Sequence, residues 1–252
     1  MNKTGIPYLD YSWNPTHGCT PISPGCERCW SKAMSKRLAG MGVKGYDKAD
    51  PFKPTFHPDR LREPLKVKKS SVIGVSFMGD LFHLDFSNDY FYATIFHVIS
   101  KCPQHTFLFL TKRPDRMALI FKTYMNPVFS NLWLGVTVEN QEQADKRIPI
   151  LLQIPGKHWV SVEPMLSEVN FRLHDDYDPI GCLRTRSDML NWIVSGCESG
   201  PGRRPAETDW FRSARDQCVS AGVPYFLKQR GNNRKVVEMP ELDGKIWDQV
   251  PW

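Results

Sequence analysis

Six short apolar runs recur along this chain at nearly even intervals, and this rhythm limits the possible folds more than any other feature. They are Val72–Phe77, Thr106–Leu110, Leu132–Val138, His158–Val162, Asn191–Val194 and Val223–Leu227. Their starts are 34, 26, 26, 33 and 32 residues apart, and a strand–helix–strand unit takes about 30 residues. Runs that are apolar throughout fit parallel strands buried on both faces. The pattern predicts a parallel α/β domain.

The intervals between the runs carry helix signals. Helices are expected over residues 30–40, 87–101, 113–125, 140–152 and 208–221. Pro114 suits a helix start, Pro149 should break the last turn of its helix, and Gly222 suits a helix end. With one more strand near Tyr8–Trp13, the elements fit a full or partial (β/α) barrel, and a doubly wound sheet is the alternative. We expect one domain over residues 1–252, with irregular insertions at about residues 40–62 and 164–189.

Composition narrows the class of protein. The 252 residues are 41% hydrophobic and 24% charged, as in ordinary globular domains. No apolar run approaches the ~18 residues of a membrane span, and the first residues lack the apolar stretch of a signal peptide. These features predict a soluble, cytoplasmic protein that does not bind membranes. The seven cysteines are then expected to stay reduced, and the net charge of +6 favours a phosphate-bearing partner.

Charged side chains follow every apolar run. They are Asp80, Lys112, Glu139, Glu163, Glu198 and Lys228. Because parallel strands present their carboxyl ends to the ligand, these groups are expected to line one mouth. Each residue taken alone has an ordinary structural alternative, such as a helix cap or an ion pair. The agreement of all six runs is what favours a functional site.

The most distinctive local feature is a loop with three cysteines, Cys19, Cys26 and Cys29, within WNPTHGCTPISPGCERCW. Cys26 and Cys29 are expected one turn apart at the start of a helix, where the helix dipole favours thiolates. Three thiolates suit zinc or an iron–sulfur cluster. His17 could complete a Cys3His zinc site, whereas a [4Fe–4S] cluster on three cysteines keeps one iron open. Three unrelated buried thiols are the third alternative.

Motifs over nearly the whole chain resemble a known family. They are WNPTHGCTPISPGCERCW, SFMGDLFH, FLTKRPDRM, LWLGVTVEN, VSVEPML, IVSGCESGPGRRP and PYFLKQRG. The family is an uncharacterised, largely phage- and prophage-associated group of three-cysteine-motif proteins. It resembles a divergent branch of the radical S-adenosylmethionine (SAM) enzymes, near the spore photoproduct lyase group. The final C-x-x-C matches that superfamily, but the first spacing is six residues here instead of three.

The resemblance implies a radical SAM-like barrel, a [4Fe–4S] cluster and bound SAM. Cys19, Cys26 and Cys29 would then ligate three irons, and Asp80 would hold the SAM amino group. Glu139 would suit the ribose hydroxyls. The remaining candidates are Lys112 and Glu163 for SAM, and Cys197, Glu198 and Lys228 for the chemistry at the substrate. The structural alternative for Cys197 is that it is a small side chain in a tightly packed position.

Three functions remain open from the sequence. The first is a radical SAM enzyme, reduced by a flavodoxin or ferredoxin, that acts on a nucleotide, nucleobase or nucleic acid. Its anionic substrate would meet cations near the strand ends, such as Arg113, Arg203 and Arg204. The second is a zinc-stabilised module that binds nucleic acid without catalysis. The third is a glycosidase using Glu139, Glu163 or Glu198, which leaves the cysteines unexplained.

Overall fold

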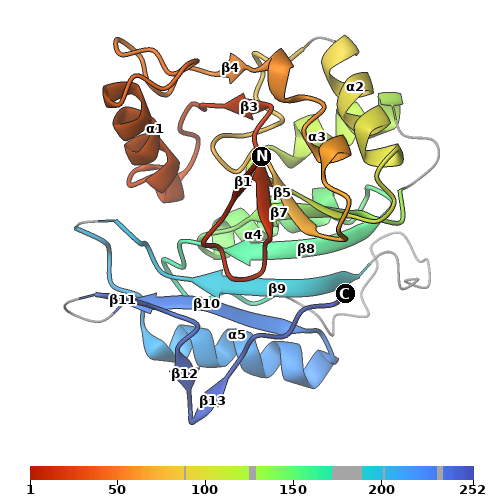
Figure 1. The fold of residues 1–252 in the computed structure, drawn as a ribbon. Helices are drawn as coiled ribbons and strands as arrows, with labels where there is room; N and C mark the ends of the chain where they lie inside the picture. Colours follow the sequence, from red (N-terminus) through yellow and green to blue (C-terminus); the bar gives the residue numbers. More distant parts are fainter. Residues whose placement is uncertain (88, 125–128, 172–188, 201, 232–234) are drawn as a thin grey trace. The chain divides into compact units, whose positions relative to one another are not determined.

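The structure is a computed structural model, and it describes residues 1–252 except 88, 125–128, 172–188, 201 and 232–234 (Figure 1). Cα packing divides the chain into two compact units, Met1–Trp133 and Leu134–Trp252. Strand β7 (Leu132–Thr137), buried along its whole length, crosses the boundary between them.

The first unit contains four sheet strands in the order β1-β2-β5-β6. Their bounds are Asn2–Lys3 for β1, Tyr11–Trp13 for β2, Val72–Val75 for β5 and Thr106–Thr111 for β6. β2, β5 and β6 are parallel, and β1 is antiparallel to β2. The central strands are apolar because both faces are covered, as their burial shows. The predicted strand near Tyr8–Trp13 is confirmed as β2.

Three α-helices and several short elements complete the first unit. The helices are α1 (Trp30–Gly40), α2 (Asp89–Ser100) and α3 (Pro114–Tyr124). Strands β3 (Thr16–His17) and β4 (Thr55–Phe56) form a separate antiparallel pair. Single 3-10 turns occupy Pro24–Cys26, Pro58–Arg60 and Pro64–Lys66. Pro114 begins α3 as predicted, since its missing N–H is one that a helix start does not use.

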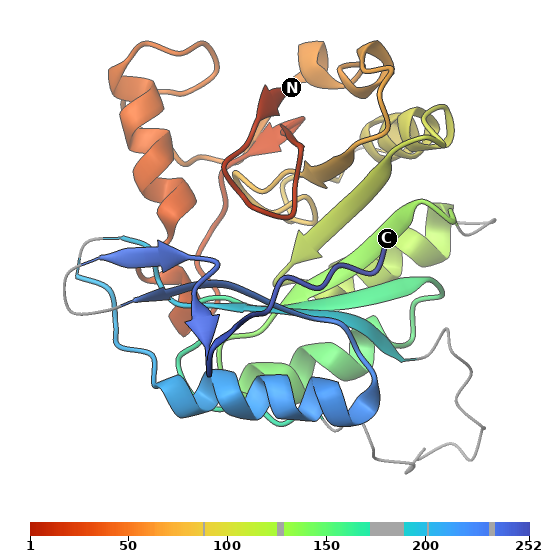
Figure 2. The same ribbon diagram turned by 60° about the horizontal axis from the view of Figure 1, so that its bottom comes forward.

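The second unit is built on β8, β9, β10 and β11, in that order. Their bounds are Lys157–Val162, Leu190–Gly196, Tyr225–Gly231 and Val236–Glu238. β8, β9 and β10 are parallel, and β11 is antiparallel to β10. Helix α4 spans Gln141–Leu151, α5 spans Thr208–Ala221, and the short strands β12 (Glu241–Leu242) and β13 (Lys245–Ile246) pair with each other. Figure 2 shows α5 lying along β9 and β10.

Most predicted elements are confirmed, and the prediction for Pro149 is wrong. Gly222 ends α5 in the left-handed conformation, at φ 68°. Pro149 was expected to break the last turn of its helix, but it lies inside α4, which continues to Leu151. Near a helix end a proline displaces few intrahelical hydrogen bonds, so the last turn survives. Asn140 caps α4 as an N-cap residue, accepting from the amide of Gln143 at 3.0 Å.

The α/β class with mostly parallel strands is confirmed, but a barrel is not. Antiparallel strands β1 and β11 end the strand order in their units, and neither unit closes its described strands into a ring. The insertion at residues 40–62 is irregular apart from β4 and one 3-10 turn, and most of the insertion at residues 164–189 lies outside the described residues. None of the described helices combines the length and apolar character that a membrane crossing requires.

Candidate functional site

The three-cysteine loop is fastened to the segment that follows β5. Gly18 and Gly79 form a parallel bridge, and the Gly18 amide donates to the Met78 carbonyl at 3.1 Å. A Cβ on Gly79 would lie 2.4 Å from the Gly18 oxygen, and Gly18 itself has φ +84°. Both positions therefore require glycine. This contact brings the HGC and MGD sequence motifs together, so the loop begins at the carboxyl end of β5.

Cys19 lies beside a fixed guanidinium. Arg113, which precedes α3, donates from Nη1 to the Cys19 Sγ at 3.1 Å and to Asp80 Oδ2 at 3.1 Å. Its Nη2 donates to the Thr20 carbonyl at 2.9 Å and to the Thr20 hydroxyl at 3.0 Å. Burial and the nearby Asp80 carboxylate raise the pKa of the Cys19 thiol to about 11, against the opposing effect of Arg113. Without a metal, Cys19 is thus held as a neutral thiol.

Asp80 organises the end of β6. Oδ1 accepts from the Phe82 amide at 3.0 Å and from the Thr111 hydroxyl at 2.7 Å. Oδ2 accepts from the Lys112 amide at 3.2 Å, besides Arg113. The carboxylate is buried, and both of its oxygens accept hydrogen bonds from donors of the same unit. To hold the SAM amino group as well, it would have to share or release one of these bonds.

Cys26 and Cys29 occupy different local structures. Cys26 ends a 3-10 turn, and Cys29 is the extended N-cap of α1, with ψ 118°. The expectation that they lie one helical turn apart is therefore wrong, because α1 begins only at Trp30. Their Sγ atoms contact serine hydroxyls, Cys26 with Ser23 at 3.8 Å and Cys29 with Ser31 at 3.1 Å.

The three thiols suit a soft metal in kind, although the structure does not group all three at one point. Among the residues that the structure describes, no three Cys, His, Asp or Glu side chains are grouped closely enough to hold a metal ion. Cys19, Cys26 and Cys29 are all free and half-buried, in one segment whose intervening residues are largely exposed. Three reduced thiols in one exposed segment suit zinc or an iron–sulfur cluster once the segment closes.

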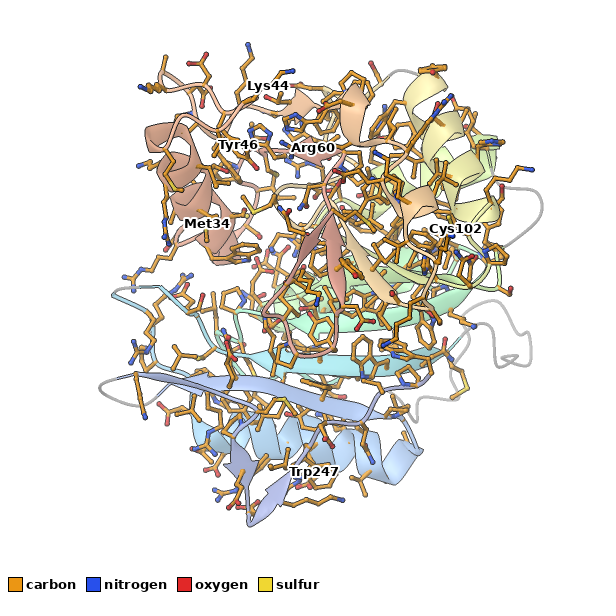
Figure 3. All side chains as sticks on the ribbon, viewed as in Figure 1. Met34, Lys44, Tyr46, Arg60, Cys102 and Trp247 are labelled. Atoms are coloured by element: carbon orange, nitrogen blue, oxygen red, sulfur yellow. The ribbon has the colours of Figure 1, made fainter. Side chains whose placement is uncertain are left out.

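His17, the predicted fourth zinc ligand, is engaged elsewhere. Its Nδ1 lies 2.8 Å from Nε2 of His57, and it also bonds to the Pro51 backbone. Burial lowers the pKa of both imidazoles to about 4, so the pair is neutral at pH 7. The two rings stack beside Tyr46, which bonds to Arg60, and Figure 3 shows these last two next to each other. The contacts within this buried aromatic cluster orient the His17 ring toward His57.

In the second unit, the ends of β8 and β10 meet through an ion pair. Lys228 Nζ lies 3.0 Å from Glu163 Oε1, and the Ser161 hydroxyl donates to Glu163 Oε2 at 3.2 Å. Between them on β9, a Cβ on Gly196 would lie 2.4 Å from Glu163 Oε1. Cys197 follows, buried, and burial raises the pKa of its thiol. The charges of Arg203, Glu163 and Lys228 act on this thiol as well.

The other two predicted carboxylates of this unit are also paired. Glu198 accepts from the Arg204 backbone at 2.7 Å and from Arg204 Nε at 3.0 Å. Glu139 is fully buried, and Arg147 donates to its Oε2 at 2.9 Å. The structure thus places Glu139, Glu163, Glu198 and Lys228 in one unit and Asp80, Lys112 and the three cysteines in the other.

Comparison with known proteins gives a family. The model of the family described as "Protein of unknown function (DUF5131)" matches residues 3–251. The chain belongs to the DUF5131 family. No curated protein and no solved structure matches this DUF5131 chain.

Sequence reasoning missed the main role of Arg113 in this DUF5131 protein. It treated Arg113 as a cation for an anionic substrate or as part of a helix start, and not as the partner of Cys19. The parallel register carried the missing signal, because Val72 pairs with Thr106. Asp80 lies eight residues beyond Val72 and Arg113 seven beyond Thr106, so both follow their strands by nearly the same distance. Once that register is known, counting along both strands places them side by side.

Proposed function

We propose that this chain is a radical SAM-type enzyme whose [4Fe–4S] cluster is held by Cys19, Cys26 and Cys29. The observation that carries the proposal is the loop of three reduced thiols, seated by Gly18 and Gly79 at the carboxyl end of β5. Ligands of parallel α/β folds bind at such strand ends. When bound, a cluster on three thiolates supplies the electron that cleaves SAM reductively, with a flavodoxin or ferredoxin as the donor.

The chain's own residues would provide the surroundings. Asp80 and Arg113 fix Cys19, and closing of the exposed segment would bring Cys26 and Cys29 to it. The resemblance also implies Lys112, Glu139 and Glu163 for SAM and Cys197, Glu198 and Lys228 for the substrate; of these, Lys112 lies in the unit that holds the three cysteines. In the described structure Glu139 and Glu198 pair with Arg147 and Arg204, and Glu163 and Lys228 pair with each other, so each of these four would have to give up an ion pair to take part.

The two alternatives are weaker on specific contacts. A Cys3His zinc site requires His17, which is committed to His57. A glycosidase requires one carboxylic acid with a raised pKa beside one carboxylate. Glu139, Glu163 and Glu198 are each paired with a cation instead.

Iron and acid-labile sulfide analysis tests the cluster. We expect about four irons per chain in anaerobically purified or reconstituted protein, as the proposed [4Fe–4S] centre requires. Cys19→Ala, Cys26→Ala and Cys29→Ala should each lose most of this iron, because each removes a thiolate ligand. Cys102→Ala is the matched control, since Cys102 is a buried thiol outside the loop (Figure 3) and its loss should leave the iron content unchanged. Zinc alone after reconstitution would refute the enzyme and support the zinc-stabilised module.

For the substrate, we propose a nucleotide or nucleic acid. The support is the net charge of +6 and the cation Arg203, whose Nε would lie 3.0 Å from a Cβ on Gly231 at the end of β10. Arg204 is a poor candidate for phosphate contact because it clamps Glu198 across the loop.

Binding of DNA, RNA and mononucleotides across a salt series tests this substrate class. Affinity should fall as salt rises, and Arg203→Ala should reduce the salt slope for a nucleic acid by about 1, as the loss of one phosphate contact predicts. Lys157→Ala is the control, because it also removes one positive charge. Lys157 lies at the amino end of β8, whereas Arg203 lies beside the carboxyl end of β10. If nothing binds at low salt, or if Arg203→Ala binds like wild type, the substrate class is wrong.

A further inference from the structure

The guanidinium of Arg113 is held rigidly at the three-cysteine loop. Four acceptors engage it: the Cys19 sulfur, one Asp80 oxygen, and the carbonyl and hydroxyl of Thr20. Its own backbone amide donates to the Thr111 hydroxyl at 2.9 Å, and that hydroxyl in turn donates to Asp80. The side chain is 9% exposed. The long arginine side chain is thus already ordered, so metal binding at the loop would cost little further conformational entropy of this side chain.

The three thiols differ in what surrounds them. Cys19 receives an N–H···S hydrogen bond from a cation, whereas the Cys26 and Cys29 sulfurs contact serine hydroxyls. Cys19 is also tied to the strand end through the Gly18–Gly79 bridge, and Cys19's own amide donates to the Phe52 carbonyl. One sulfur is therefore fixed in place, and two lie in the more exposed part of the segment.

We infer that Arg113 is the positioning residue of the metal–thiolate centre: it fixes Cys19 as the first ligand and keeps an N–H···S bond to that sulfur in the metal-bound state. Cys26 and Cys29 then close onto the metal that Cys19 holds. Donors to ligand sulfurs offset the negative charge of a thiolate centre, which strengthens metal binding and makes a cluster easier to reduce. This inference rests on the proposed function only in requiring a metal at the three thiols, whether zinc or a cluster.

Cadmium binding to the metal-free protein tests the inference without a cluster. Under anaerobic conditions, Cd²⁺ is titrated while the thiolate-to-cadmium absorption is recorded. Arg113→Gln should weaken Cd²⁺ binding roughly 10- to 100-fold, the usual effect of losing an outer partner of a ligand. The Cd²⁺ affinity of Arg113→Lys should lie between those of wild type and Arg113→Gln, because a lysine keeps the charge but cannot bridge Cys19, Asp80 and Thr20. Arg37→Gln, an exposed change of the same charge in α1, should bind like wild type.

A second variant guards against a folding defect. Thr20→Val removes an exposed hydroxyl that accepts from Arg113 and also bonds to the His83 ring, and it leaves the guanidinium and Asp80 in place. It should weaken Cd²⁺ binding by a smaller factor, with an unchanged melting temperature of the metal-free protein. In iron-loaded protein, Arg113→Gln should lower the reduction potential, a readout that a purely structural role would not move.

The outcomes separate this inference from the proposed function. If Arg113→Gln and Thr20→Val bind Cd²⁺ as wild type does, or if the wild-type thiols bind no Cd²⁺, the role of Arg113 is refuted. If the variants weaken Cd²⁺ binding as expected while the wild type never acquires iron and sulfide, Arg113 keeps its role and the radical SAM proposal is refuted.

Discussion

Replacing Asp80 with alanine should destabilise the chain by about 3–5 kcal/mol, the usual cost of removing one partner from a buried ion pair. The substitution leaves Arg113 without its carboxylate. It also leaves the Thr111 hydroxyl and the amides of Phe82 and Lys112 without their acceptor. Unsatisfied buried donors add to the loss. The shift in the midpoint of denaturant unfolding measures this loss of stability, and the slope of the free energy against denaturant concentration should stay unchanged.

Two further variants make the Asp80 experiment specific. Asp85→Ala is the matched control, because this carboxylate is exposed and lies 3.7 Å from the His83 ring; its effect should stay within about 0.5 kcal/mol. Asp80→Asn keeps one acceptor oxygen but turns an amide group toward the donors. Its loss of stability should therefore lie between those of Asp85→Ala and Asp80→Ala. If Asp80→Ala unfolds at the wild-type midpoint, the described network does not contribute to stability.

The strands were readable from the sequence because burial on both faces leaves a plain chemical signature. LWLGVTV and HWVSV predicted β7 and β8, which are buried along nearly their whole length. Such a run has no polar face to obscure its bounds, so the predicted and observed strands nearly coincide. The same runs could not say whether the sheet closes. Closure depends on how the end strands pair, and β1 and β11 turned out to be short antiparallel additions.

The candidate site was only partly readable, because sequence shows which charges follow the strands but not which charges they meet. Glu139, Glu163 and Glu198 were placed at strand ends correctly. Their cations come from a helix, a strand two places along the sheet and a loop: Arg147, Lys228 and Arg204. Pairing of this kind is decided by side-chain direction across elements, which no periodicity encodes. Likewise, three cysteine positions predict a donor set, but only a bound metal would draw mutually repelling thiolates together.

Glu139 offers the other large effect, because it is a fully buried carboxylate with a buried cation. Arg147, on α4, donates from one nitrogen to Glu139 at 2.9 Å and to the Thr137 carbonyl at 2.7 Å. Glu139→Gln should therefore cost about 3–5 kcal/mol in the free energy of unfolding, since it strands the Arg147 charge in the interior. Glu142→Gln, an exposed carboxylate on the same helix, should change stability by no more than about 0.5 kcal/mol.

A double-mutant cycle identifies the cause of the Glu139 effect. Arg147→Met together with Glu139→Gln removes the charge that Glu139→Gln leaves unpaired, so the double variant should be more stable than the sum of the two single losses predicts. The coupling between the residues should exceed 1 kcal/mol, as direct contact inside a protein allows. Additive losses would show that the pair does not interact. A Glu139→Gln protein of wild-type stability would return Glu139 to the residues available for a ribose hydroxyl, because its charge would then have no structural task.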